Sequence, residues 1–223
     1  VDLTTAESIG KYAFVYCHEL TTVTLGEKIT EIPEYTFADC KKLESINLSR
    51  IETVGQYAFS ECRAMTNVVL SVAETVGEGA FIYNSALIDV MLNPEGCVLE
   101  NNAFAECESL NGVQNLDAVT SIGDYAFLNS ALTEVNLTAA EHIGTYAFMK
   151  SEKTPFKVTL GEDLKTLGDN PFAMCKLDPF CKVDVYNFNG VDYSKNIYTY
   201  DLSETVKVID GSLSKKNESQ ITC

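Results

Sequence analysis

The chain has 223 residues, of which 46% are hydrophobic and 22% charged, as in ordinary soluble globular proteins. Its formal net charge of −16 argues against nucleic acid or an anionic membrane as a partner, because both attract clustered lysine and arginine. No apolar run approaches the roughly 20 residues that a membrane-spanning helix needs, and no signal-peptide pattern opens the sequence. We therefore expect no membrane insertion by this segment.

The acidity is uneven along the chain. Between Arg63 and Lys150 there is no lysine or arginine, and this window of 86 residues contains 11 aspartates and glutamates. Solubility alone is a sufficient explanation. The alternatives are a basic partner surface, or loosely held cations, at the middle of the molecule.

A short motif recurs along most of the chain. It first occurs as IGKYAF at residues 9–14, and its final phenylalanine returns at intervals of 23, 22, 22, 23, 23, 21 and 24 residues. Eight of the chain's eleven phenylalanines occupy this one position, namely Phe14, Phe37, Phe59, Phe81, Phe104, Phe127, Phe148 and Phe172. Self-similarity at this period indicates a repeat architecture.

Each repeat has the same predicted elements. Long strand-like runs with period-two alternation occupy residues 20–25, 43–48, 65–70, 87–92, 132–137, 156–160 and 181–185, and shorter runs lead into the next motif. A glycine usually follows the short run, where we expect it to adopt a backbone conformation that costs other residues more. Phe14, Cys17 and Leu20 then fall at i, i+3 and i+6, which predicts one helical turn with a buried face.

A unit of about 22 residues cannot enclose a core alone, but stacked units bury a continuous one. The sequence therefore predicts an α/β repeat solenoid of about eight coils of 21–24 residues, with a parallel sheet and short helical turns. Adjacent coils should lie about 4.8 Å apart where their strands pair. The fifth unit, LNGVQNL, has one extra residue, so we expect a β-bulge there.

The two ends of the chain differ from the array. Leu3 precedes Leu25 by 22 residues, so VDL at 1–3 is expected to be the end of a strand. We assign residues 1–186 to the repeat array. Residues 187–223 leave the period and are predicted to form a C-terminal cap of irregular strands followed by a polar tail.

No catalytic, cofactor or metal site is predicted. Five of the eight cysteines follow the repeated phenylalanine by three residues, and we expect them to form a row of buried free thiols: Cys17, Cys40, Cys62, Cys107 and Cys175. Disulfides along that row, between Cys17 and Cys40 or Cys40 and Cys62, are the alternative. His18 and His142 belong to different parts of the repeat and should not converge, and no CxxC, HExxH or GxSxG motif is present.

Candidate binding residues are those that point outward from the long strands, where a repeat protein presents an extended surface. Most of these positions hold small polar residues, which is expected of a solvated sheet. Val69 and Met91 differ because they are apolar, outward and in adjacent coils, and such a pair can mark a contact patch. The candidate partner-binding residues are Asn67, Val69, Asp89, Met91, Glu134 and Asn136.

The recurring pattern IGxxAFxxCxxLxxVxL resembles the BspA-type leucine-rich repeat over residues 1–186. The resemblance implies a right-handed leucine-rich-repeat rod in an extracellular or cell-surface protein, with binding or adhesion to host or neighbouring proteins and no enzyme activity. We expect a monomer with a protein partner. Two alternatives stay open: a structural spacer within a longer array, and a carbohydrate-binding module that would use the aligned tyrosines Tyr12, Tyr35, Tyr57, Tyr125 and Tyr146.

Overall fold

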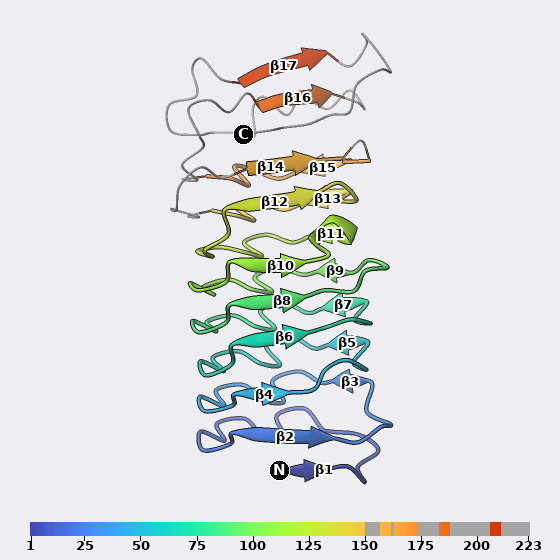
Figure 1. Cartoon of the computed structure of the whole chain (residues 1–223), viewed down its shortest axis with the longest axis vertical. Helices are drawn as coiled ribbons and strands as arrows, with labels where there is room; N and C mark the ends of the chain where they lie inside the picture. The colour runs from blue at the N-terminus through green and yellow to red at the C-terminus, as the bar shows by residue number, and fades with distance from the viewer. Residues whose placement is uncertain (150–156, 162, 174–182, 188–205, 211–223) are drawn as a thin grey trace.

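The chain winds into a right-handed coil whose turns stack along one axis, so that each turn contributes one long strand to one face and one short strand to the opposite face (Figure 1). The computed structural model describes residues 1–149, 157–161, 163–173, 183–187 and 206–210. In this part of the chain there are about seven turns, each with its own short strand, and every strand pairing is parallel. The parallel solenoid is therefore confirmed, whereas the described residues do not extend to eight complete coils.

The short strands form one continuous sheet. Successive coils pair in strict register, for example Ile32 with Val54 and Val54 with Val76, as the period of about 22 residues predicts. The seven strands are β3 (Glu31–Ile32), β5 (Thr53–Val54), β7 (Thr75–Val76), β9 (Val98–Leu99), β11 (Ser121–Ile122), β13 (His142–Ile143) and β15 (Thr166–Leu167).

The long strands are less continuous, because they divide into three separate sheets. The first contains β1 (Asp2–Leu3), β2 (Thr22–Leu25) and β4 (Ser45–Ile46); the second β6 (Asn67–Val69), β8 (Asp89–Met91) and β10 (Gly112–Gln114); the third β12 (Glu134–Leu137) and β14 (Lys157–Leu160). Leu3 pairs with Leu25, so the expected strand end at the start of the chain is confirmed.

The predicted helical turns are wrong for the described residues, whose only helix is the three-residue 3₁₀ segment η1 (Leu116–Ala118). The backbone around Phe14 instead forms successive tight turns. The amide of Ala13 donates to Gly10 within the coil (3.3 Å), whereas those of Tyr12 and Phe14 donate to the next coil. Amides that donate to the next coil are not available for the bonds to the fourth preceding carbonyl that continue an α-helix. The α/β class is therefore corrected to a β solenoid.

Most positive φ angles in these turns belong to tyrosine and other residues with side chains, such as Tyr12 (φ 60°) and Tyr16 (φ 61°), and Gly79 (φ 58°) takes the tyrosine position in the fourth unit. The recurring glycine serves a different purpose from the one expected. A Cβ on Gly123 would lie 2.5 Å from the amide nitrogen of Asn101 in the preceding coil, and one on Gly144 would lie 2.4 Å from that of Asp124. At these positions the coils approach too closely for a side chain, although Pro33 and Glu100 occupy the equivalent place in the second and fifth units.

The core is a column of stacked phenylalanine rings between the two faces. Ring centroids of the eight repeated phenylalanines lie 5.2–5.5 Å apart in successive coils. Phe37 through Phe148 of this column are fully buried, while Phe14 in the first coil is only partly buried. Offset stacking of this kind adds about 0.5–1.5 kcal/mol per pair to the burial of the rings.

The cysteine row follows the phenylalanine column with one exception. Cys40, Cys62 and Cys107 are buried free thiols, as predicted, and none of the described cysteines forms a disulfide. Cys17 is exposed, so its predicted burial is wrong. Cys40 is covered by the coil before it, where its thiol donates to Phe14 O, whereas Cys17 lies in the first coil that the structure describes. Cys175, Cys181 and Cys223 lie outside the described residues.

At the C-terminal end, β16 (Val183–Asn187) pairs in parallel with β17 (Val206–Asp210). β16 crosses the expected limit of the array at residue 186. The division into an array and a cap stays a prediction, since most of residues 187–223 lie outside the described part of the chain.

Candidate binding face

Four of the six candidate residues form a block on two adjacent long strands. Asn67 on β6 lies in register with Asp89 on β8, and Val69 lies in register with Met91. The residues between them, Val68 and Val90, are buried, so the alternation turns all four candidates outward. Val69 is 40% exposed and Met91 is half-buried beside it.

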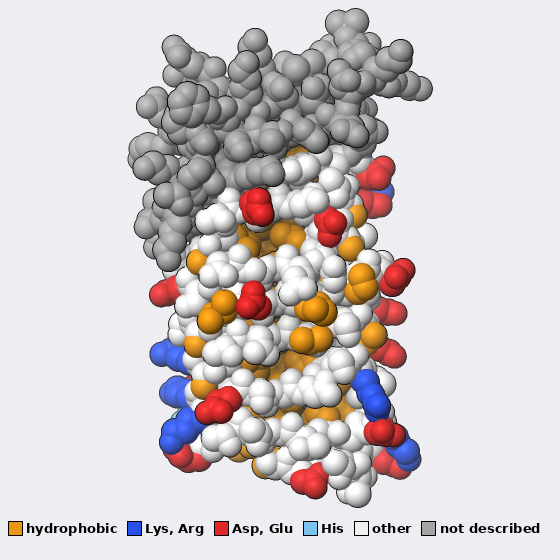
Figure 2. Space-filling model, viewed as in Figure 1, with side chains coloured by type: hydrophobic (Ala, Val, Ile, Leu, Met, Phe, Trp, Pro, Cys, Tyr) orange, Lys and Arg blue, Asp and Glu red, His pale blue; other side chains and the backbone are white. Residues whose placement is uncertain are grey.

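Two further apolar side chains reach the surface in the coils that carry this block. Ile88, just before β8, is 42% exposed, and Val72, just after β6, is 41% exposed. Figure 2 shows hydrophobic side chains emerging in the middle of the long-strand face. We refer to Val69, Val72, Ile88 and Met91 as the aliphatic patch. Sequence analysis missed Ile88 and Val72 because it considered only the outward strand positions.

The other two candidates lie on a separate sheet. Glu134 and Asn136 are exposed on β12, where they pair in register with Lys157 and Thr159 of β14. β10 lies between β12 and the aliphatic patch. The structure therefore places all six candidates on the long-strand face, but in two groups.

A hollow of about 560 Å³ separates the two groups where β10 and β12 fail to pair. It is closed at one end by the hydrogen bond from Ala131 N to Leu110 O (2.9 Å) and at the other by that from Ala139 N to Asp117 O (3.2 Å). Between these points no backbone hydrogen bond joins residues 111–116 to residues 132–138 in the described structure. The hollow is lined by Asn111, Gly112, Val113, Gln114, Asn115, Leu116, Asp117, Leu132, Glu134, Val135, Asn136 and Thr159.

The hollow originates in the extra residue of the fifth unit. Asn115 adopts a left-handed conformation (φ 63°, ψ 25°), and its side-chain amide donates to Leu92 O at 2.8 Å. η1 then carries the chain away from the position that a continuing strand would occupy. The expected bulge is thus a break between two sheets, and sequence analysis predicted its position but not its size.

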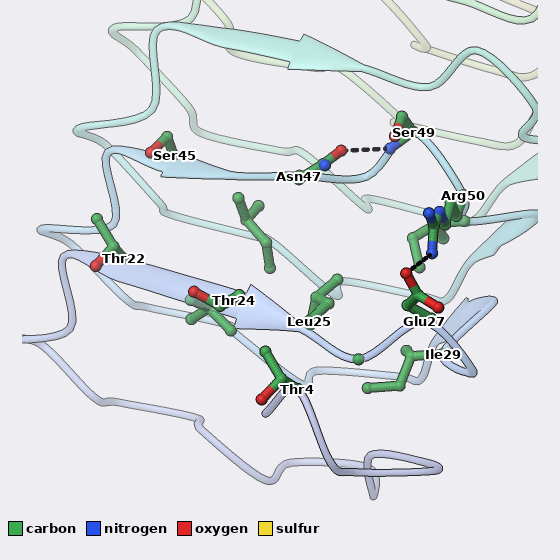
Figure 3. Close-up of a pocket in the computed structure, with 14 residues that line it drawn as sticks. Thr4, Thr22, Thr24, Leu25, Glu27, Ile29, Ser45, Asn47, Ser49 and Arg50 are labelled. Carbon is green, nitrogen blue, oxygen red and sulfur yellow. Dashed lines mark hydrogen bonds and ion pairs between the residues drawn. The ribbon is translucent and has the colours of Figure 1, made fainter. Parts of the chain in front are cut away.

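A second hollow, of about 730 Å³, lies at the N-terminal end of the same face. Figure 3 shows that the chain at Asn47 diverges from β2 beyond the paired residues Val23 and Ile46. Hydroxyl and amide side chains border this hollow, namely Thr4, Thr22, Thr24, Ser45, Asn47 and Ser49. An ion pair between Arg50 and Glu27 (3.4 Å) stands at one end. The sequence contains no signal for this divergence.

Positive charge on the described surface is confined to the ends of the array. Every lysine and arginine whose side chain the structure describes lies beside a carboxylate, and most of these partners come from an adjacent coil, as in Lys11 with Glu34 (2.9 Å) and Lys165 with Glu141 (2.5 Å). The middle of the long-strand face shows acidic and neutral side chains and no basic ones (Figure 2). The central coils therefore present a negative surface.

The buried thiols are unsuited to nucleophilic chemistry. Burial raises the pKa of the Cys40 and Cys107 thiols to about 12 and that of Cys97 to about 11, so all three are protonated at neutral pH. The two histidines do not converge, as predicted: His18 contacts Asp39 (2.9 Å) and His142 contacts Thr166 (2.7 Å). No three His, Cys, Asp or Glu side chains in the described part of the chain are grouped as metal ligands.

The aligned tyrosines contact one another. Tyr35 stacks on Tyr12 at 5.2 Å and on Tyr57 at 5.0 Å, and Tyr125 stacks on Tyr146 at 5.5 Å. Both faces of the Tyr35 ring are therefore covered. This row lies among the turns rather than on the long-strand face, and its rings pack against one another.

Comparison with known proteins identifies the repeat. The family model described as "BspA type Leucine rich repeat region (6 copies)" matches residues 3–111 and 74–189. No curated protein matches the sequence. Within the described residues there is also no helix of the length and apolar character that crossing a membrane requires.

Comparison with solved structures finds three leucine-rich repeat proteins. A leucine-rich repeat protein from Bacteroides ovatus is 15% identical, with a TM-score of 0.50 over 92% of this chain and 73% of that one. A leucine-rich cell surface protein from Faecalibacterium prausnitzii is 18% identical, with a TM-score of 0.49 over 78% of this chain and 58% of that one. The Treponema pallidum leucine-rich repeat protein is 24% identical, with a TM-score of 0.42 over 55% of this chain and 69% of that one.

The family model covers well over half of the chain, and the parallel coils have the register that its repeat requires. The chain belongs to the BspA-type leucine-rich repeat proteins.

Proposed function

We propose that this chain is a non-enzymatic module of an extracellular or cell-surface protein, and that it binds another protein through the long-strand face at the aliphatic patch. The observation that carries the proposal is the side-by-side placement of Val69 and Met91, with Ile88 and Val72 exposed in the same coils. Isolated exposed apolar residues are normal on soluble proteins, whereas contiguous ones mark contact sites. The proposed extracellular location is supported by the family, whose repeats occur in bacterial surface proteins.

The partner's chemistry follows from what surrounds the patch. Asn67 and Asp89 flank it on the same two strands, and no lysine or arginine occurs between residues 64 and 149. A partner surface with an apolar centre and a basic rim complements this arrangement, because charge complementarity raises the association rate and excludes acidic competitors.

Two alternatives predict different surfaces. A structural spacer requires no exposed apolar patch on its central coils, which disfavours it here. A carbohydrate-binding module requires free aromatic faces, and stacking within the tyrosine row covers both faces of Tyr35.

The proposal is tested by capture with the immobilised chain from a panel of extracellular-matrix and epithelial surface proteins. We expect specific capture by the wild-type chain, reduced at least tenfold by Val69→Asp and by Met91→Asp, because each places a charge in the apolar contact. Val98→Asp is the matched control, since Val98 is 36% exposed on β9 of the opposite sheet. The proposal fails if nothing is captured above a variant with permuted outward residues, or if Val98→Asp weakens capture as much as Val69→Asp.

A further inference from the structure

We propose that the hollow between β10 and β12 receives an arginine side chain of the protein partner. This inference rests on the proposed function, in that the hollow belongs to the same face as the aliphatic patch. It adds the chemical identity of one partner group and the place where that group binds.

The hollow is built by a feature of one coil. Asn115 is the residue that the other long-strand runs lack, and its left-handed backbone together with η1 separates β10 from β12. The continuous short-strand sheet on the opposite face holds the same coils together, with Leu99 paired to Ile122 and Ile122 to Ile143. The long-strand face is therefore open at this point without loss of the solenoid.

The floor of the hollow is apolar. Val113 and Leu116 line it from the β10 side, and Leu132 and Val135 line it from the β12 side. Val113 is only partly buried, whereas the equivalent residues Val68 and Val90 in the preceding coils are buried. Figure 2 shows hydrophobic surface inside this recess. Such a floor suits the three methylene groups of an arginine side chain, which pack on apolar surface while the charged end stays polar.

The rim supplies hydrogen-bond acceptors that a guanidinium group needs. Side-chain amides come from Asn111, Gln114 and Asn136. An exposed carboxylate comes from Asp117, at the end that the hydrogen bond between Ala139 and Asp117 closes. The facing edges of β10 and β12 add backbone groups that do not pair with each other. Arginine has five donors in a planar fork and is the cation best matched to several oxygen acceptors at once, whereas lysine binds as a point charge.

The surrounding charge favours a cation and disfavours an anion. Asp89 lies directly beside the hollow's border, since a Cβ on Gly112 would be 2.2 Å from its Oδ1 atom. The window from residue 64 to residue 149 supplies no lysine or arginine of the chain's own to this border. β10 separates the hollow from Met91, so a partner would present an apolar side chain and an arginine on the order of 10 Å apart, about two strand spacings.

The test is a titration of the ¹⁵N-labelled chain, followed by NMR, with the blocked peptide acetyl-Gly-Arg-Gly-amide. The isosteric acetyl-Gly-citrulline-Gly-amide, which lacks the charge, is the control ligand. We expect saturable millimolar binding of the arginine peptide, with shifts confined to the amides of residues 111–117 and 134–136. Binding should weaken at least fivefold in 0.5 M NaCl, because screening is strong at that ionic strength.

Asp117→Asn should weaken the arginine peptide at least threefold, whereas Glu108→Gln, which removes the same charge from an exposed turn position, should leave it unchanged. The inference is overturned if the arginine peptide produces no localised shifts, if citrulline binds equally well, or if both substitutions have the same effect. If the arginine peptide does not bind but capture of a partner still depends on Val69, only the arginine site is rejected. If the arginine peptide binds but the chain captures no partner, only the proposed function is rejected.

Discussion

The repeated Phe-x-x-Cys spacing places a small hydrogen-bond donor against a buried carbonyl of the coil before it. The thiol of Cys62 donates to Phe37 O at 3.2 Å, and that of Cys107 donates to Phe81 O at 3.2 Å. Asn84 takes the same position in the fourth unit, and its side-chain amide donates to Phe59 O at 2.8 Å. A cysteine here is thus both a small hydrophobe and a hydrogen-bond donor to a buried carbonyl of the preceding coil.

The exposed and buried thiols should differ sharply in reactivity. In the native protein at pH 8, iodoacetamide should modify Cys17 within minutes, while Cys40, Cys62 and Cys107 should stay unmodified until the chain is unfolded. Their burial and raised pKa keep them protonated and inaccessible. Peptide mass spectrometry after timed labelling measures each site.

The same pKa values have a consequence for stability at alkaline pH. The thiol of Cys40 titrates near 9.0 when unfolded and near 12 when folded, so above pH 9 the unfolded chain releases its proton first. The stability of the native state should therefore fall as pH rises from about 9 toward 12.

Equal labelling of Cys17 and Cys62 in the native protein would contradict this account of the row.

At the scale of elements, the sheet that carries the candidate site is the one that is broken. The short-strand sheet runs through seven strands, while the long strands split between β4 and β6 and again between β10 and β12. At the second split, Asn115 and the following 3₁₀ segment replace the direct continuation of the strand. A single inserted residue thus changes a regular ladder into a recess.

Deleting Asn115 should restore that ladder. The shortened run would place Leu116 directly after Gln114, as Leu92 directly follows Met91, so that β10 and β12 can pair. We expect amide hydrogen exchange at Asn136 to slow at least tenfold, because this amide would gain a backbone acceptor.

Asn115→Gly is the matched control, since glycine accepts the left-handed conformation and preserves the length. Exchange in this variant should resemble that of the wild type. If the deletion variant exchanges as fast as the control, the extra residue does not cause the split.

Sequence reasoning predicted the strands and their register well, because an apolar period of about 22 residues can be satisfied only by stacking Leu3 on Leu25 and Val54 on Val76. It mistook the turns for helix because Phe14, Cys17 and Leu20 share a face in both arrangements. The spacing of hydrophobic residues does not reveal that the backbone amides of the turns donate alternately within their own coil and to the next coil. The sizes of the hollows were likewise unpredictable, since they depend on how far neighbouring strands diverge.

On the scale of the whole molecule, the distribution of charge and the position of the hollow both favour the long-strand face as the binding surface. The basic side chains that the structure describes belong to the first three coils and to Lys165, and all lie beside carboxylates. Exposed pairs of this kind contribute only about 0–1 kcal/mol each, so their main effect is to neutralise the ends of the array. The central coils keep their negative charge around the aliphatic patch, which leaves that region complementary to a basic partner.

Hydrogen-exchange mapping of the chain bound to its captured partner tests the central claim most directly. We predict that protection will be confined to peptides covering residues 66–72, 88–92 and 111–117, which contain the aliphatic patch and the border of the hollow. Peptides covering 98–101 and 121–124, on the opposite sheet, should exchange as in the free chain. Protection centred on those short-strand peptides, or on the tyrosine turns, would contradict the assignment of the long-strand face as the binding surface.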